Sequence, residues 1–132
     1  MVGEALYELK AKGKIRAIGA GMNQWQMELQ LAEHGGFDCF LLAGRHTLLD
    51  QSALPEFLNY CHEHAISVIA GGPYNSGILA VGPRERATYN YEPAVGEVIE
   101  KARRIREACA AMKCHSEQLL CNSSLRILRS LQ

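Results

Sequence analysis

Two short glycine-containing segments carry residue types that could bind a ligand, and the first spans residues 19–24. Its glycines and Asn23 imitate the start of a dinucleotide-binding fingerprint. Gln24 stands where that fingerprint needs its third glycine, which allows the helix to pack closely on the strand. A complete Rossmann motif is therefore not favoured. A tight turn before a helix explains the same residues and is compatible with a different kind of cofactor contact.

The second segment, residues 71–77, is the more informative of the two. Its three glycines allow the backbone to come close to a ligand. Tyr74, Asn75 and Ser76 add a flat ring and hydrogen-bonding groups, which suits a phosphate or a stacked heterocycle. An ordinary strand-to-helix connection has the same composition. From composition alone both interpretations stay open.

Histidines and cysteines give weaker signals. His46 lies beyond an expected strand end, where a solvated surface histidine is the ordinary interpretation. Cys109, Cys114, His115 and Cys121 are close in sequence, but their spacing matches no usual zinc pattern. We therefore expect reduced thiols and no metal site.

Hydrophobic periodicity predicts strands that alternate with helices, which implies parallel strands joined by right-handed crossovers. Ligands bind such sheets at the carboxyl ends of the strands, so any site is expected in the loops that follow them. The expected strands are 14–19, 37–43 and 66–70, and the loops are 20–24, 44–51 and 71–83. The expected helices are one ending near Gly13, one capped by Asn23 and closed by Gly35, one capped by Ser52 with Pro55 in its first turn, and a long one beginning at Pro93.

Composition narrows the classes of function. The chain has 132 residues, 48% of them hydrophobic and 21% charged, which is typical of one globular domain or a piece of one. Lys plus Arg and Asp plus Glu both number 14, so no excess of positive charge favours nucleic acid or an anionic membrane. No leader segment or membrane-spanning run is visible, and a cytoplasmic location is expected.

The stretches KIRAIGAGMNQW, FDCFLLAGRHTLLDQSALPEF and ISVIAGGPYNSGIL resemble the aldo-keto reductase superfamily. The resemblance is strongest to its D-threo-aldose 1-dehydrogenase branch, which includes L-fucose and galactose dehydrogenases, and it covers about residues 2–112. It implies an α/β fold of the (β/α)8 TIM-barrel type that uses NAD or NADP without a Rossmann domain. A complete barrel has about 250 residues. The chain therefore corresponds to a half barrel whose strands are equivalent to strands 5–7.

The resemblance also assigns part of a cofactor site. Asn23 matches the asparagine that holds the nicotinamide carboxamide, while Pro73, Asn75 and Ser76 match the loop that approaches the pyrophosphate. Gly71 stands in place of the tyrosine that often stacks on the nicotinamide. The catalytic Asp, Tyr, Lys and His of the family come from its first four strands, so no catalytic residue is expected here.

The expected activity of the parent enzyme is oxidation of an aldose at C1 to the lactone, with aldose and nicotinamide cofactor as partners. We expect this chain alone to be inactive. The alternative is a non-catalytic half barrel that binds nucleotide weakly at most, or no cofactor at all, and that self-associates or docks to a separate N-terminal half.

The end of the chain departs from the family pattern. Residues 1–112 read as the C-terminal half of the barrel, whereas residues 113–132 read as a non-family tail of helical character. A shifted reading frame near codon 114 would restore a family-like continuation, so we interpret the tail as the product of a frameshift. Because the barrel edges and inner face would be left open, either the tail folds back over them or two chains form a homodimer. Of these two outcomes, the homodimer with the tail in its contact is the one we expect.

Overall fold

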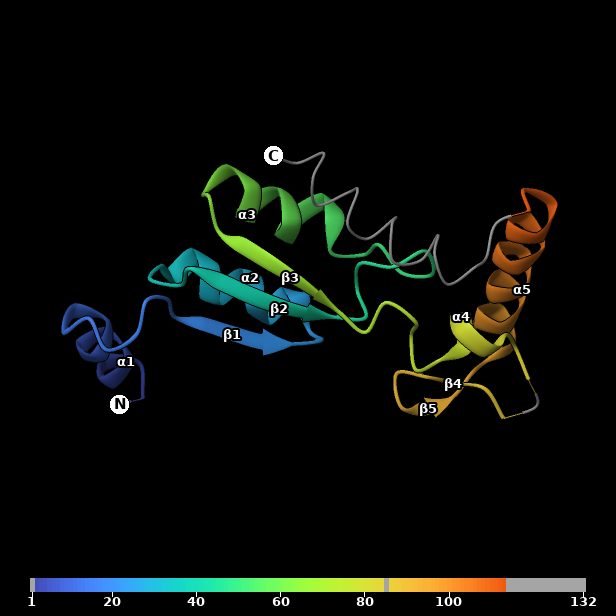
Figure 1. Cartoon of the computed structure of the whole chain (residues 1–132), viewed down its shortest axis with the longest axis horizontal. Coiled ribbons are helices and arrows are strands. Elements are labelled where there is room, and N and C mark those ends of the chain that lie inside the picture. Colours follow the sequence, from blue (N-terminus) through green and yellow to red (C-terminus); the bar gives the residue numbers. More distant parts are fainter. Residues whose placement is uncertain (1, 85, 114–132) are drawn as a thin grey trace.

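A three-stranded parallel sheet lies at the centre of the molecule (Figure 1). The computed structural model describes residues 2–84 and 86–113. The strands are β1 (Gly19–Met22), β2 (Cys39–Ala43) and β3 (Ser67–Gly71), in the order β1-β2-β3. Gly21 is level with Leu41, which in turn is level with Ile69. The predicted parallel α/β arrangement is confirmed, and the described residues form no closed barrel.

Helices precede, connect and follow these strands. They are α1 (Val2–Ala11), α2 (Trp25–His34), the π-helical η1 (Leu54–Leu58) that runs into α3 (Asn59–Glu63), α4 (Ile78–Val81) and α5 (Gly96–Ala111). A short antiparallel hairpin of β4 (Thr88–Tyr89) and β5 (Glu92–Pro93) lies between α4 and α5.

One face of the sheet is covered by α2, η1 and α3. Phe40 and Leu42 of β2 point into this layer and are fully buried. Phe40 meets Phe57 edge to face, with ring centroids 5.6 Å apart. The other buried members of this cluster, which we call the sheet core, are Ala32, Ala53, Leu58 and Cys61.

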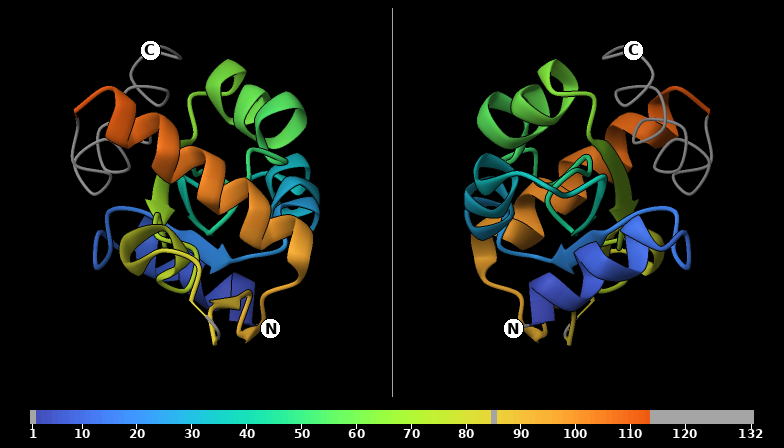
Figure 2. Two further views of the ribbon diagram at one scale, coloured as in Figure 1. Left: turned by 90° about the vertical axis from the view of Figure 1, so that its right-hand side faces the viewer. Right: turned by 90° about the vertical axis from the view of Figure 1, so that its left-hand side faces the viewer.

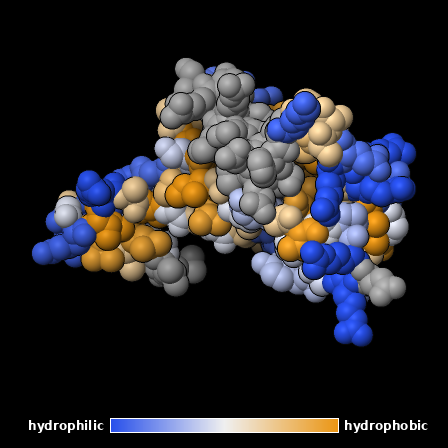
Figure 3. Space-filling model, turned by 45° about the vertical axis from the view of Figure 1, so that its right-hand side comes forward, coloured by the Kyte–Doolittle hydropathy of each residue, from blue (hydrophilic) through white to orange (hydrophobic). Residues whose placement is uncertain are grey.

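The opposite face of the sheet is open. Leu41 and Ile69 point to this side, and 43% and 56% of their respective surfaces are exposed. Gly19 lies on the same face, where an added Cβ would stand 2.7 Å from the Cys39 Sγ. Within residues 2–84 and 86–113 no further strand pairs with the free edges of β1 or β3. Hydrophobic residues also reach the surface near α1, at the left of Figure 3, and Leu9 of this helix is 41% exposed.

A second apolar cluster lies at the carboxyl end of the sheet, and α5 runs across that end (Figure 2). Leu49, from the loop after β2, packs there against Ile78 and Leu79 of α4 and Ala102 of α5. The Lys101 Nζ donates to the Leu49 carbonyl over 2.6 Å, which fastens α5 to this loop. We call this group the α5 cluster.

The first strand differs from its prediction, because β1 shares only Gly19 with the expected range 14–19. The Asp38 carboxylate accepts a hydrogen bond from the Ile18 backbone nitrogen at 2.7 Å and also binds Lys10 of α1. These bonds hold the chain in a bend before residue 19. Parallel pairing with β2 therefore starts only at Gly19.

Helix ends were predicted with mixed success. Gly13 and Gly35 follow α1 and α2 with positive φ angles of 67° and 82°, as expected of residues that end helices. Asn23 is not the cap of α2, because the helix begins one residue later, behind Gln24. Ser52 does not cap the third helix either, since η1 begins behind Ala53.

The segment after β3 also departs from the prediction. The expected loop 71–83 contains the short helix α4. Pro93 belongs to β5 instead of starting the last helix, which begins at Gly96. Ala102 and Cys109 of α5 are buried, whereas Val95 and Met112, which flank the two ends of this helix, are exposed.

Candidate functional site at the carboxyl end of the sheet

The loops that leave β2 and β3 are tied together at the carboxyl end of the sheet. The Gly44 backbone nitrogen donates to the Gly71 carbonyl at 2.8 Å. The Asn75 side-chain amide donates to the Gly44 carbonyl at 3.0 Å. The glycine-rich turn after β3 is thus fixed to the end of β2.

Arg45 links the loop after β2 to the loop after β1. Its Nε donates to the carbonyl of the half-buried Asn23 at 3.0 Å. One of its terminal nitrogens donates to the Asp50 Oδ2 at 2.9 Å, and these two side chains are only 20% and 13% exposed. The Tyr89 hydroxyl donates to the same carboxylate oxygen at 2.9 Å. This Arg45–Asp50–Tyr89 cluster joins Asn23 to the β4–β5 hairpin.

The ionisable members of this cluster influence one another. Burial alone would raise the pKa of Asp50, but hydrogen bonds from Ser52, Arg45 and Tyr89 outweigh it and lower that pKa. Burial and the neighbouring Asp50 carboxylate raise the pKa of the Tyr89 hydroxyl. Near neutral pH the cluster therefore consists of a charged pair and a neutral phenol.

The glycine-rich turn has an unusual backbone. Asn75, Ser76 and Gly77 take three consecutive positive φ angles of 47°, 58° and 90°. Asn75 is buried, and its Oδ1 has no hydrogen-bond partner in the part of the chain that the structure describes. Its side chain thus points into the fold and holds the turn, while Ser76 is exposed and Pro73 is half-buried.

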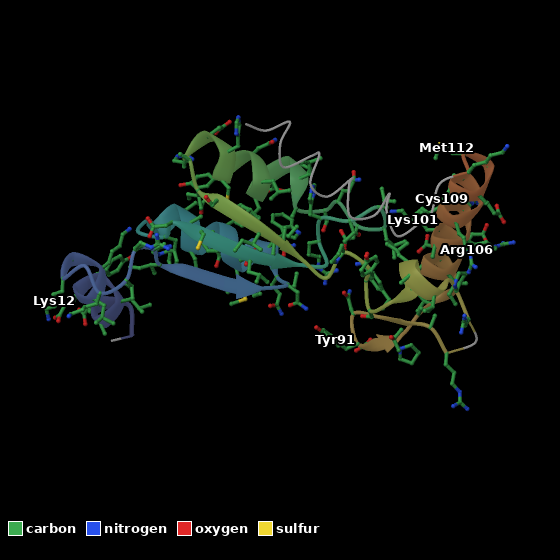
Figure 4. All side chains as sticks on the ribbon, in the orientation of Figure 1. Lys12, Tyr91, Lys101, Arg106, Cys109 and Met112 are labelled. Carbon is green, nitrogen blue, oxygen red and sulfur yellow. The ribbon has the colours of Figure 1, made fainter. Side chains whose placement is uncertain are left out.

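The β4–β5 hairpin approaches the same region. Its two-residue turn consists of Asn90 and Tyr91, with positive φ angles of 52° and 68°. In the amide orientation that satisfies both groups, the Asn90 side-chain oxygen accepts from the terminal nitrogens of Arg45 at 3.2 and 3.1 Å. Tyr91 is 87% exposed, and Figure 4 shows it reaching from the hairpin toward the carboxyl end of the sheet.

Glu28 was missed by the sequence analysis. It is completely buried in α2, and its Oε1 accepts from the Met22 backbone nitrogen at 3.2 Å. Burial raises the pKa of Glu28 to about 7. The hydrogen bond from Met22 lowers this pKa, but by less than burial raises it. Glu28 falls on the same helical face as Trp25 and Ala32, and this acidic residue within an apolar stripe is the signal that could have revealed it.

His46 and the cysteines of the described residues do not gather into a metal-binding cluster. The expectation of a solvated His46 is wrong: its side chain is buried, and burial lowers its pKa. Among residues 2–84 and 86–113, no three His, Cys, Asp or Glu side chains are placed to hold a metal ion. Cys114, His115 and Cys121 of the postulated cluster lie outside the described residues.

A separate groove lies between α5 and the hairpin. It has a volume of about 620 Å³. Its lining consists of Leu49, Tyr89, Glu97, Val98, Glu100, Lys101 and Arg104. The residues that the resemblance assigns to a cofactor are not part of this lining, whereas Tyr89 of the Arg45–Asp50–Tyr89 cluster is.

Parallel strands alternating with helices, with polar loops joined at the carboxyl ends, define a segment of an α/β barrel-type protein. The model of the Aldo/keto reductase family matches residues 2–126, and the chain belongs to this family. That match extends beyond residue 112, while the division of the chain at that residue stays a prediction. Within the described residues, no helix is long and apolar enough to span a bilayer.

Three curated proteins illustrate the relationship. The chain is 38% identical over 105 residues to pyridoxal 4-dehydrogenase of Microbacterium luteolum, a match that covers 80% of this chain and 31% of that protein. It is 33% identical over 106 residues to D-threo-aldose 1-dehydrogenase of a Pseudomonas species, with 80% and 32% covered. It is 26% identical over 118 residues to NADH-specific methylglyoxal reductase of Escherichia coli K12, with 83% and 36% covered. The chain thus spans about a third of the length of these relatives.

Proposed function

We propose that this chain forms part of the cofactor site of an NAD- or NADP-dependent oxidoreductase. The observation that carries the proposal is the joining of the loops after all three strands at one end of the sheet. Arg45 holds the Asn23 carbonyl, and Asn75 holds Gly44. Membership of the Aldo/keto reductase family supports the redox class.

The residues present fit a nicotinamide cofactor in distinct ways. Asn23 offers a side-chain amide at the end of β1, suited to the nicotinamide carboxamide. Gly71 lacks a side chain, and an added Cβ would approach the Leu41 Cδ2 to 3.1 Å, so no larger residue fits without movement. Pro73 and the exposed Ser76 line the turn toward the pyrophosphate. We assign Asn75 a structural role in the turn, because its side-chain amide already donates a hydrogen bond to the Gly44 carbonyl.

For the parent enzyme we propose oxidation of an aldose at C1 to the lactone, consistent with the similarity to a D-threo-aldose 1-dehydrogenase. Pyridoxal is the second substrate to test, because pyridoxal 4-dehydrogenase is also a relative. The bound cofactor supplies the hydride acceptor. The role we assign to this chain is to orient the cofactor, and we assign it no catalytic residue.

By itself the chain is proposed to be inactive. The alternative is a non-catalytic half barrel, and the open sheet face with Leu41 and Ile69 favours its association as a homodimer or with a separate N-terminal half. A cytoplasmic location and the lack of nucleic-acid and membrane partners remain part of this proposal.

The deciding experiment titrates the 132-residue chain with NAD+ and NADP+ and then assays aldoses and pyridoxal for turnover. We expect saturable cofactor binding that Asn23→Ala weakens, and no turnover. The matched control is Gln26→Ala, an exposed change near the start of α2. Failure of both cofactors to bind would contradict the proposed site, and turnover by the pure chain would contradict its inactivity. Sedimentation at micromolar concentration tests the dimer, which a 14.6 kDa species alone would contradict.

A further inference from the structure

Arg45 holds the backbone of Asn23 where the hydrogen bonds of the sheet end. Met22 is the last residue of β1 that pairs with β2. Asn23 follows in a bend before α2, and the cap of that helix is Gln24. The Arg45 Nε donates to the Asn23 carbonyl at 3.0 Å. A bond from the neighbouring loop thus takes the place of strand pairing at this residue.

The Arg45 side chain is itself held on several sides. A terminal nitrogen donates to the Asp50 Oδ2 at 2.9 Å, and the Tyr89 hydroxyl donates to the same oxygen. The Asn90 side-chain oxygen accepts from both terminal nitrogens at 3.2 and 3.1 Å in the orientation given above. Only 20% of the Arg45 side chain is exposed. A lysine could not serve all these partners at once, because its ammonium lacks the planar fork of donors.

Stability alone does not account for this arrangement, because the cost of desolvation offsets much of the attraction within a buried ion pair. The bond to Asn23 has a geometric consequence instead. A carbonyl held in place fixes the peptide plane that follows Asn23. Before this residue, the Met22 backbone nitrogen donates to the Glu28 Oε1 at 3.2 Å. The chain is thus held on both sides of Asn23, which fixes the direction in which its side chain leaves the backbone.

We propose that Arg45 is a positioning residue for the nicotinamide cofactor. It acts by fixing the backbone from which the Asn23 side-chain amide reaches the nicotinamide carboxamide. This inference rests on the proposed function, in which Asn23 binds that carboxamide. Arg45 contacts no cofactor atom in this role, and the resemblance to the family assigns it none.

The test replaces Arg45 by lysine, which keeps the charge and loses the Nε donor. The matched control is Arg16→Lys, an exposed change before β1, on the far side of that strand from Asn23. Each 132-residue protein is titrated with NAD+ and with ADP-ribose, which lacks the nicotinamide. Backbone hydrogen exchange at residues 22–24 is measured by NMR without ligand.

We expect Arg45→Lys to bind NAD+ about threefold to tenfold more weakly, the range for the loss of one hydrogen bond, and to bind ADP-ribose as the unaltered chain does. Exchange at residues 22–24 should accelerate in Arg45→Lys and not in Arg16→Lys. Because Arg45 acts through Asn23, the double variant Asn23→Ala/Arg45→Lys should bind NAD+ no more weakly than Asn23→Ala alone.

A second variant, Arg45→Gln/Asp50→Asn, removes both charges and so leaves neither buried without a partner. It should show the same selective loss of NAD+ affinity, and it carries the test if Arg45→Lys does not fold. Unchanged NAD+ affinity, an equal loss for NAD+ and ADP-ribose, or additive losses in the double variant with Asn23→Ala would each overturn the positioning role and leave the proposed cofactor site intact. If the unaltered chain binds neither ligand, the proposed cofactor site fails together with this inference.

Discussion

Replacement of Glu28 by glutamine tests whether this buried carboxyl group makes stability depend on pH. Glu28 is completely buried in α2, and its pKa is raised from 4.5 to about 7. The folded chain therefore keeps this proton to a higher pH than the unfolded chain. Stability is greatest below the unfolded pKa of 4.5 and falls as the pH rises toward 7.

The size of the effect follows from the shift. A change of one pKa unit corresponds to 1.36 kcal/mol, so a shift of this size lowers the free energy of unfolding by about 3 kcal/mol between pH 4.5 and 8. Glu28→Gln has no such titration. Its amide retains an oxygen that can accept the Met22 N–H bond, so its other effects are independent of pH.

The assay is urea unfolding followed by circular dichroism at pH 5, 6, 7 and 8. The stability difference between Glu28→Gln and the unaltered chain should grow by about 2 to 3 kcal/mol over this range in favour of the variant. Glu33→Gln, an exposed change on the same helix, is the matched control and should show no such trend. A difference between Glu28→Gln and the unaltered chain that stays constant with pH would refute the reasoning.

Two further changes probe the sheet and the glycine-rich turn. Gly19→Ala should lower the free energy of unfolding by about 1 to 3 kcal/mol, because the new Cβ would meet the Sγ and carbonyl oxygen of Cys39 at 2.7 and 2.9 Å; an unchanged urea midpoint would contradict this. Asn75→Ala should cost about 1 to 3 kcal/mol, since the Gly44 carbonyl loses its side-chain donor. Hydrogen exchange should then accelerate in residues 71–77 and not in α2, and uniform acceleration would argue against a local role.

Strands β2 and β3 were predictable because continuous apolar residues leave few alternatives. Residues 37–43 and 66–70 contain β2 and most of β3 for that reason. The first strand was misplaced because Asp38, twenty residues away, binds the Ile18 backbone nitrogen and delays pairing. No local pattern contains that contact.

The residues of the candidate site also fall into two groups, those that the sequence predicts and those that it does not. The glycine-rich turn and Asn23 were visible because their residue types and spacing are local. The Arg45–Asp50–Tyr89 cluster was not, since Tyr89 lies 39 residues from Asp50 in sequence and 44 from Arg45. Helical spacing placed Glu28 on the apolar face of α2, so it could have been found from the sequence.

The separation of the sheet core from the α5 cluster gives the molecule two built-in chemical reporters. Cys61 lies in the sheet core, and burial together with the nearby Glu28 raises its thiol pKa to about 12. Cys109 is buried on α5. Because only an exposed thiolate reacts with an alkylating reagent, the labelling rate of each cysteine measures how often its own part of the protein opens. Peptide mapping by mass spectrometry would therefore show whether the two parts unfold together, without any substitution in the chain.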